Sequence, residues 1–289
     1  MSPKATVPPK MPMPAAPPPP AVSNVQESSS TEFGKLAPSN IGYRIVLNAV
    51  EGFGKTSMPS FATNPAIIMC KGETGYETLL SAGRVPSIDA AKAETWADLL
   101  GLVSTVGKSK QPYEVLAIDA AGGAERLCHE MVCARDFKGD WGERGFTSYQ
   151  KGYEVALADW LELLARLDKV RQRGTHILIL SHAKIKTSKN PMGEDFDRYV
   201  ADCHEKTWGL THKWSDAVLF GTFITITDKK KGDSKSKGIG GTDRIVYAEH
   251  RDAFDAKNRF GMPAEIEIPN DPKAIWDTIF QHIAAKKGT

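Results

Sequence analysis

Four short apolar runs, separated by longer polar or mixed segments, dominate the hydrophobic pattern of the chain. Each is rich in β-branched residues, and the last is continuously apolar in its middle, as in a strand covered on both faces of a parallel sheet. We therefore predict four strands of a mostly parallel sheet. The runs are YRIVLN at 43–48, AIIMC at 66–70, VLAID at 115–119 and THILILS at 175–181.

Helical periodicity occurs between these runs and after them. Apolar residues recur every three to four positions over 96–103 and 149–167, and Gly174 marks the end of the second helix. Asn270-Asp271-Pro272 is a cap followed by proline, which predicts a final helix from 270 to 283. Alternating strands and helices favour one α/β domain with helices on both faces of its sheet.

The segments after the fourth run have a different pattern. Residues 183–213 are polar and too long for a passive connection, so we expect them to be functional or mobile. Two further β-rich runs, 216–227 and 244–250, predict an antiparallel extension of the sheet near the C-terminus. They flank 229–241 (KKKGDSKSKGIGG), which suits an exposed hairpin tip.

Composition divides the chain into an arm and a body. Ten of the 18 prolines lie within residues 1–40, which predicts a disordered, proline- and serine-rich arm followed by one domain over 41–289. That domain carries 34 basic and 33 acidic residues, so nucleic acid could be bound only through local patches. The chain has neither a signal-peptide core nor an apolar run of eighteen residues, and its four cysteines form no CxxC pair. We expect a cytoplasmic protein that does not span a membrane.

The strongest chemical motif follows the first predicted strand. Ala49-Val50-Glu51-Gly52-Phe53-Gly54-Lys55-Thr56 fits the Walker A pattern, except that alanine replaces its first glycine. Such a loop turns backbone N–H groups toward the phosphates of a nucleotide, and we expect a short helix to start near Lys55. Lys55 would neutralise the β- and γ-phosphates of ATP, and Thr56 would ligate Mg²⁺. The predicted nucleotide-binding residues are Glu51, Gly52, Phe53, Gly54, Lys55, Thr56 and Ser57.

Acidic residues at the ends of two other strands complete the predicted site. Asp119 ends the third run and is the candidate second magnesium ligand, because the metal is approached from the carboxyl edge of the sheet. Ala120 follows it, so a catalytic base must come from elsewhere or be absent. Glu73 is our candidate, because the 66–70 strand is expected to neighbour the P-loop strand; Glu51 is a weaker one. His182, at the end of the fourth run, could sense the γ-phosphate or be merely structural.

Taken together, these motifs resemble a phage family of small RecA-like ATPases that includes AAA-domain nucleotide-binding proteins and single-strand-annealing recombinases. The resemblance covers about 41–285, and the pairing of WSDAVLF with AKNRFGMP is its more specific part. It implies a RecA-type P-loop NTPase core, Mg-ATP, and a role in recombination or annealing on single-stranded DNA beside a single-stranded-DNA-binding protein. Glu73 would take the catalytic glutamate position and His182 the switch position, where RecA proteins usually have glutamine.

The same resemblance implies contacts outside the nucleotide site. Lys257 and Arg259 would reach the γ-phosphate of a neighbouring subunit in a homo-oligomer. Loops corresponding to 136–148 and 183–213 would contact DNA. In the 183–213 loop, phosphate contacts and one stacking platform would come from Lys184, Lys186, Lys189, Arg198 and Tyr199. The lysines of 229–241 could also contact DNA, but a solvated charged hairpin explains them equally well.

Two other classes of function stay open on the sequence. A P-loop kinase would use 183–213 as a closing lid, although Arg198 is its only arginine. A nucleotide-dependent binding module with little turnover would fit the lack of glutamate beside Asp119. If the chain is phage-encoded, its compartment is the host cytoplasm.

Overall fold

The computed structural model of the chain describes residues 40–228 and 237–284. The arm predicted over 1–40 therefore lies outside the described residues, apart from Asn40. Lys229, Lys230, Lys231 and Lys235 of the predicted hairpin tip also lie outside them. Among the helices that are described, none is long and apolar enough to cross a membrane.

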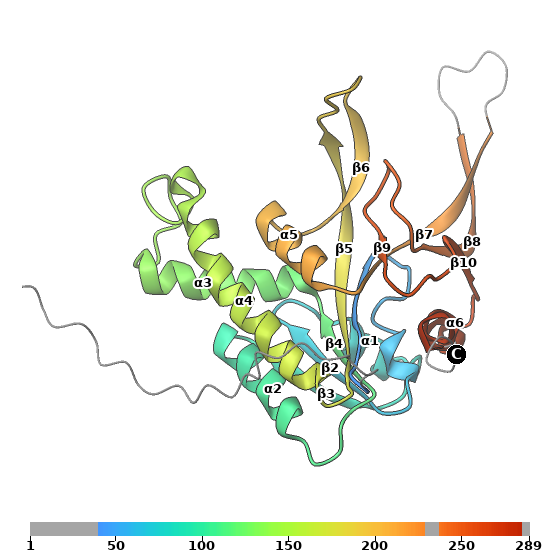
Figure 1. Cartoon of the computed structure of the whole chain (residues 1–289), viewed down its shortest axis with the longest axis horizontal. Helices are drawn as coiled ribbons and strands as arrows, with labels where there is room; N and C mark the ends of the chain where they lie inside the picture. Colours follow the sequence, from blue (N-terminus) through green and yellow to red (C-terminus); the bar gives the residue numbers. More distant parts are fainter. Residues whose placement is uncertain (1–39, 229–236, 285–289) are drawn as a thin grey trace, which may run out of the picture. The chain divides into compact units, whose positions relative to one another are not determined.

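Ten strands within the described residues form one sheet in the order β10-β8-β7-β1-β5-β4-β2-β3, with β6 added to β5 and β9 to β7 (Figure 1). The strands from β7 to β3 in this order are parallel, whereas β6, β8, β9 and β10 pair antiparallel with their neighbours. The sheet is mostly parallel and has a C-terminal antiparallel extension, as predicted, but β7, which was expected in that extension, also pairs parallel with β1. The strands are β1 (Arg44–Ala49), β2 (Pro65–Cys70), β3 (Asp89–Ala93), β4 (Val115–Asp119), β5 (His176–Ser188), β6 (Phe196–Ala201), β7 (Ala217–Asp228), β8 (Lys237–Tyr247), β9 (Lys257–Asn258) and β10 (Glu265–Ile268).

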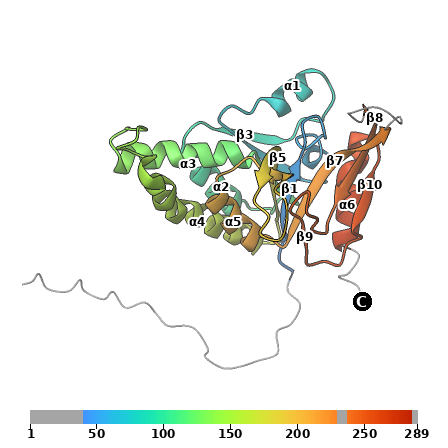
Figure 2. The ribbon, with the colours of Figure 1, turned by 90° about the horizontal axis from the view of Figure 1, so that it is seen from above.

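Helices cover both faces of this sheet, which confirms a second part of the prediction. In Figures 1 and 2, α2 to α5 lie on one side of the strands and α6 on the other. The buried side chains of α1 and α6 belong to the same cluster as one another, and those of α2, α3 and α4 belong to a second cluster. The helices are α1 (Gly75–Ser81), α2 (Trp96–Lys108), α3 (Ala121–Asp136), α4 (Lys151–Arg171), α5 (Glu205–Trp214) and α6 (Pro272–Ala284), with 3-10 turns η1 (Pro59–Phe61) and η2 (Ser148–Gln150).

The inner positions of strand β1 are buried, and all of them except Asn48 are apolar. Val46 packs into the cluster of α2, α3 and α4, whereas Ile45 and Leu47 pack into the cluster of α1 and α6. All three side chains are buried because successive residues of a strand point to opposite faces and both faces are covered.

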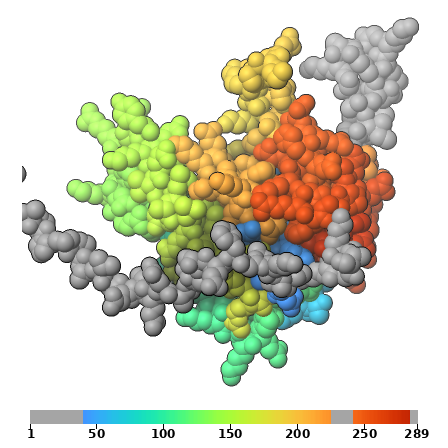
Figure 3. Space-filling view, in the orientation of Figure 1, coloured from blue at the N-terminus to red at the C-terminus, as the bar shows by residue number. Residues whose placement is uncertain are grey.

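The polar segment 183–213 is not a loose connection, which corrects the expectation of mobility from length alone. Strand β5 continues past the sheet edge to Ser188, pairs with β6 as an antiparallel hairpin, and is followed by α5. This hairpin projects from the body (Figure 3). Most of its exposed positions are polar, although Ile185 and Met192 are exposed too, so it lacks the apolar run that reveals a core strand.

An ion-pair cluster joins β1 to the start of β7 at the edge opposite the P-loop. Arg44 Nη2 lies 2.7 Å from Asp216 Oδ1, and the Arg44 backbone N–H donates to the same carboxylate. Arg259 Nη1 lies 3.3 Å from Asp216. Burial alone would raise the pKa of Asp216, but the hydrogen bonds and charge of Arg44 lower it below its usual value.

Asp216→Asn should therefore destabilise the fold at neutral pH by roughly 1.5–3 kcal/mol, as expected for losing hydrogen bonds to a charged group. Because the pKa of Asp216 is lowered in the folded state, its charge stabilises the fold at pH values above the pKa of the unfolded chain. This stabilisation is lost as pH falls through the folded-state pKa. The difference in unfolding free energy between wild type and variant should shrink below about pH 4. Urea titrations at several pH values measure it, with Asp136→Asn, in an exposed pair with Arg135, as the control. A difference independent of pH would contradict this account.

Candidate nucleotide site at the carboxyl edge of the sheet

The P-loop leaves β1 and passes beside β7. Its backbone is tied there by Val50 N–H, which donates to Gly221 O at 3.1 Å. Gly52 and Gly54 have φ of 72° and 101°, a region that favours glycine, so the loop needs both residues. Phe53 is buried between them, against Gly221. The loop geometry is therefore fixed by two glycines and one buried ring.

Lys55 lies inside the loop. Its ammonium donates to Ala49 O at 2.8 Å and to Val50 O at 3.0 Å, and the residue is only 6% exposed. Burial lowers the pKa of Lys55, against the opposing effect of Asp119, Glu51 and Glu73. A buried ammonium whose partners are neutral carbonyl oxygens gains charge pairing when phosphate oxygens replace them.

Thr56 and Asp119 meet at the end of β4. Thr56 Oγ1 donates to Asp119 Oδ2 at 2.7 Å, and Asp119 is almost fully buried. Burial raises the pKa of Asp119, while the bond from Thr56 opposes the shift. A hydroxyl beside a buried carboxylate is the oxygen donor set that Mg²⁺ takes in phosphate sites. These two residues fit Mg²⁺ and would hold it, and the ion would supply positive charge at the buried carboxylate.

Glu73 and His182 lie together at the same edge. His182 Nε2 is 3.6 Å from Glu73 Oε1, and both side chains are partly exposed. Ala49 of β1 is in register with His182 of β5, so His182 lies next to the start of the P-loop. The structure thus brings Glu73, His182, Asp119 and Lys55 to one edge.

The expected adjacency of the Glu73 strand and the P-loop strand is wrong. Strands β5 and β4 lie between β2 and β1. Glu73 reaches the site because the loop after β2 turns back: a Cβ on Gly75 would lie 3.3 Å from Thr56 Oγ1. Gly75 lets this loop approach Thr56 closely, and its sequence context, KGETGYE, carries no motif that reveals this role.

The short helix expected near Lys55 is also a wrong prediction. Only a turn bonded from Met58 N–H to Gly54 O and the 3-10 turn η1 follow the loop. Pro59 lacks the N–H that would bond to Lys55 O, and its ring would clash with that carbonyl, so an α-helix cannot propagate. The helix dipole therefore contributes less here than predicted.

Lys257 and Arg259 lie near the other edge of the sheet, away from the P-loop of their own chain. Strand β9 pairs Lys257 with Val218 of β7, and Arg259 contacts Asp216. Lys257 Nζ donates to three carbonyl oxygens at the end of α5, so its donors are used within the chain. Arg259 is half exposed. A role in a neighbouring subunit stays a prediction for both.

The predicted DNA-contacting residues all lie on the β5–β6 hairpin, where each cation has an acidic partner. The pairs are Lys184 with Asp202, Lys186 with Glu205, Lys189 with Asp195 and Arg198 with Asp255. The Tyr199 ring packs at 5.0 Å from Phe220, so it is held against the body rather than presented as a free platform. DNA contact by these residues stays a prediction.

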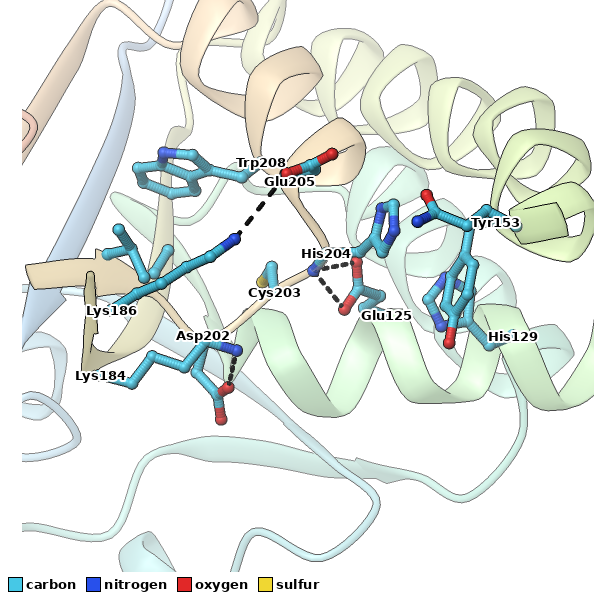
Figure 4. A pocket seen from close by; sticks show the side chains of 13 residues that line it. Glu125, His129, Tyr153, Lys184, Lys186, Asp202, Cys203, His204, Glu205 and Trp208 are labelled. Atoms are coloured by element: carbon cyan, nitrogen blue, oxygen red, sulfur yellow. Dashed lines mark hydrogen bonds and ion pairs between the residues drawn. The ribbon is translucent and has the colours of Figure 1, made fainter. Parts of the chain in front are cut away.

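A cavity of about 610 Å³ lies at the base of this hairpin, and no sequence motif indicates it. Figure 4 shows Lys184 and Lys186 on one side and the rings of Tyr153, His204 and His129 on the other. Tyr153 and His204 stack at 4.3 Å, and burial, with the charge of His204, lowers the pKa of His129 to about 4. The three rings come from distant segments, so no local motif reveals their contact.

The fold and the site define a class of protein. A glycine-bearing loop after a buried parallel strand, with a buried lysine, a threonine and a strand-end aspartate, is the core of a P-loop NTPase. A sequence model of the AAA domain family matches residues 41–260, and the chain belongs to this family. Family membership indicates nucleotide binding and ATPase activity. No curated protein matches the chain.

Proposed function

We propose that the chain is a RecA-like ATPase that hydrolyses Mg-ATP and acts on single-stranded DNA in phage recombination or strand annealing. The contact between Thr56 and Asp119 carries the nucleotide part of this proposal. Bound Mg²⁺ would supply charge neutralisation for the phosphates. Lys55 would exchange its carbonyl partners for phosphate oxygens, and backbone N–H groups of 52–56 would donate to the β-phosphate.

Glu73 is the proposed base of the hydrolytic step. It would orient a water molecule and take its proton as the oxygen attacks the γ-phosphorus; the bond between that phosphorus and the β–γ bridging oxygen breaks, and ADP leaves. His182 lies 3.6 Å from Glu73 and supports a role in holding this carboxylate or sensing the γ-phosphate.

Hydrogen bonds link the proposed nucleotide site to the base of the β5–β6 hairpin. The carbonyl of His182 accepts a hydrogen bond from Asp202 N–H at 2.8 Å, at the base of the hairpin. Glu125 of α3, the helix that begins just after Asp119, accepts the N–H of His204 at the start of α5. These contacts support coupling between the ATP site and the cavity residues.

The DNA part of the proposal is supported by the chemistry of that cavity and by the resemblance to recombinases. Lys184 and Lys186 offer phosphate contacts, and the Tyr153–His204 pair offers a stacking surface for a base. Their acidic partners Asp202 and Glu205 would have to yield to phosphate, which predicts weak binding that requires assembly. In such an assembly, Arg259 rather than Lys257 would act on a neighbouring subunit's ATP, because the donors of Lys257 are occupied.

A salt series of ATP hydrolysis with and without single-stranded DNA tests this proposal. We expect DNA to change the hydrolysis rate and to be shifted in a gel at low salt, with affinity falling as salt rises. The Lys186→Ala variant should weaken DNA binding. It should also reduce the slope of log affinity against log salt concentration by about 1. The Lys169→Ala variant, at the far end of α4, is the matched control.

The outcomes separate the candidate functions. If DNA alters neither rate nor mobility at low salt, the recombinase proposal fails. ATP binding without hydrolysis would then favour a binding module, and phosphate transfer to an added acceptor would favour a kinase. Repeating the assay over a range of protein concentrations tests assembly: a constant rate per subunit would contradict a site completed in trans.

A further inference from the structure

Two side chains from the antiparallel pair of β7 and β8 lie beside the P-loop, and no sequence motif gives either of them a role. Phe223 of β7 lies so close to the loop that a Cβ on Gly52 would be 3.9 Å from its Cζ. Arg244 of β8 is in register with Phe223, and its guanidinium lies over that ring at 5.9 Å. An aromatic ring and a cation therefore lie next to each other at the loop.

The sheet order says which part of a nucleotide would meet them. Asp119, His182 and Glu73 belong to β4, β5 and the loop after β2, all on one side of β1. A bound metal and the γ-phosphate would therefore lie on the β5 side of β1. The opposite end of the nucleotide then extends toward the other side of β1, where β7 and β8 lie. Phe223 and Arg244 are on the nucleoside side.

Arg244 has unused hydrogen-bonding capacity. Its Nε and Nη1 atoms are buried and have no partner in the described part of the chain. Buried donors without acceptors destabilise a fold, and native proteins keep few of them. Arg251 is a useful contrast: it also lies over an aromatic ring, Tyr247, but it pairs with Glu265. Among the described residues, Arg198 Nε is also buried without a partner, but Arg198 pairs with Asp255 through Nη2, whereas Arg244 has no ion pair there, and this difference points to a ligand.

We propose that Phe223 and Arg244 form the nucleobase site of the bound nucleotide. The base would stack on the Phe223 ring, and Arg244 Nε and Nη1 would donate to acceptor atoms on its edge. This inference rests on the proposed nucleotide binding at the P-loop. It assigns specificity for a nucleotide over bare phosphates to the C-terminal extension rather than to the loop itself.

Calorimetric titration with Mg-ATP and with inorganic tripolyphosphate plus Mg²⁺ tests this site. Tripolyphosphate keeps the phosphates and lacks the base. We expect Arg244→Met to weaken ATP binding about tenfold or more, and Phe223→Leu several-fold, with tripolyphosphate binding unchanged in both. Arg251→Met is the matched control and should change neither affinity. Arg244→Met should melt no lower than wild type, because it removes unsatisfied buried donors.

The results distinguish failure of the inference from failure of the proposed function. If wild type binds ATP but Arg244→Met and Phe223→Leu bind it equally well, the nucleobase site is wrong and the P-loop proposal stands. An equal loss for ATP and tripolyphosphate would also overturn it, because Arg244 would then act on phosphates. If wild type binds neither ligand, the proposed function itself fails, and this inference with it.

Discussion

Glu73→Gln should lower the rate of ATP hydrolysis by about 10²–10⁴-fold while ATP affinity stays close to that of wild type. The amide keeps the size of the side chain but cannot accept the proton of the attacking water, and general base catalysis contributes an effect of this size. Affinity is preserved because the groups that hold phosphate and metal, Lys55, Thr56 and Asp119, are unchanged. Phosphate release measures the rate, and a fluorescent ATP analogue measures the affinity.

Glu51→Gln is the matched control, because Glu51 is the rival base. Glu51 is exposed on the loop, whereas Glu73 lies beside His182. We expect Glu51→Gln to keep most of the hydrolysis rate. If it loses hydrolysis and Glu73→Gln does not, the base is Glu51. Unchanged hydrolysis in Glu73→Gln alone is enough to reject our assignment.

Lys55→Met should weaken Mg-ATP binding by about 10²-fold or more, and hydrolysis should be lost with it. A buried ammonium that pairs with phosphate oxygens contributes several kcal/mol of binding energy, and methionine keeps only its apolar stem. Burial lowers the pKa of Lys55, so burying this charge opposes folding, whereas its hydrogen bonds to Ala49 O and Val50 O favour folding. The melting temperature of the variant should therefore stay close to that of wild type.

Lys92→Met provides the control for loss of a lysine elsewhere. Lys92 is on β3 and pairs with Glu77 at the surface. Nucleotide affinity should not change in this variant. Mg-ATP binding by Lys55→Met at wild-type strength, in a protein that is folded by circular dichroism, would contradict the assigned role of the loop.

The core strands were predictable because their burial leaves a trace in the sequence. Strands β2 and β4 match their apolar runs closely, since both of their faces are covered. Strand β3 was missed, because DAAKA is mostly exposed and only Ala93 of it enters the core. The hairpin of β5 and β6 was missed for a related reason: pairing of polar strands beyond the sheet edge produces no hydrophobic pattern.

The candidate site was predictable in part. A motif and a strand end were sufficient to name Lys55, Thr56 and Asp119, because their spacing follows from the topology of parallel strands. The way in which the loop after β2 brings Glu73 to the site was not predictable, because strand order depends on contacts between segments far apart in the chain. Arg244 could not be recognised at all from sequence, because what distinguishes it is that its buried Nε and Nη1 have no partner among the residues that the structure describes.

A structure of the full chain with Mg²⁺ and an ATP analogue that cannot be hydrolysed tests the central claim most directly. We predict the triphosphate in the loop of 50–56, with Lys55 on the phosphates and Mg²⁺ bound beside Thr56 and Asp119. Glu73 should then face the γ-phosphate. A nucleotide found elsewhere, for example in the cavity beside Tyr153 and His204, or a metal held away from Asp119, would contradict the account.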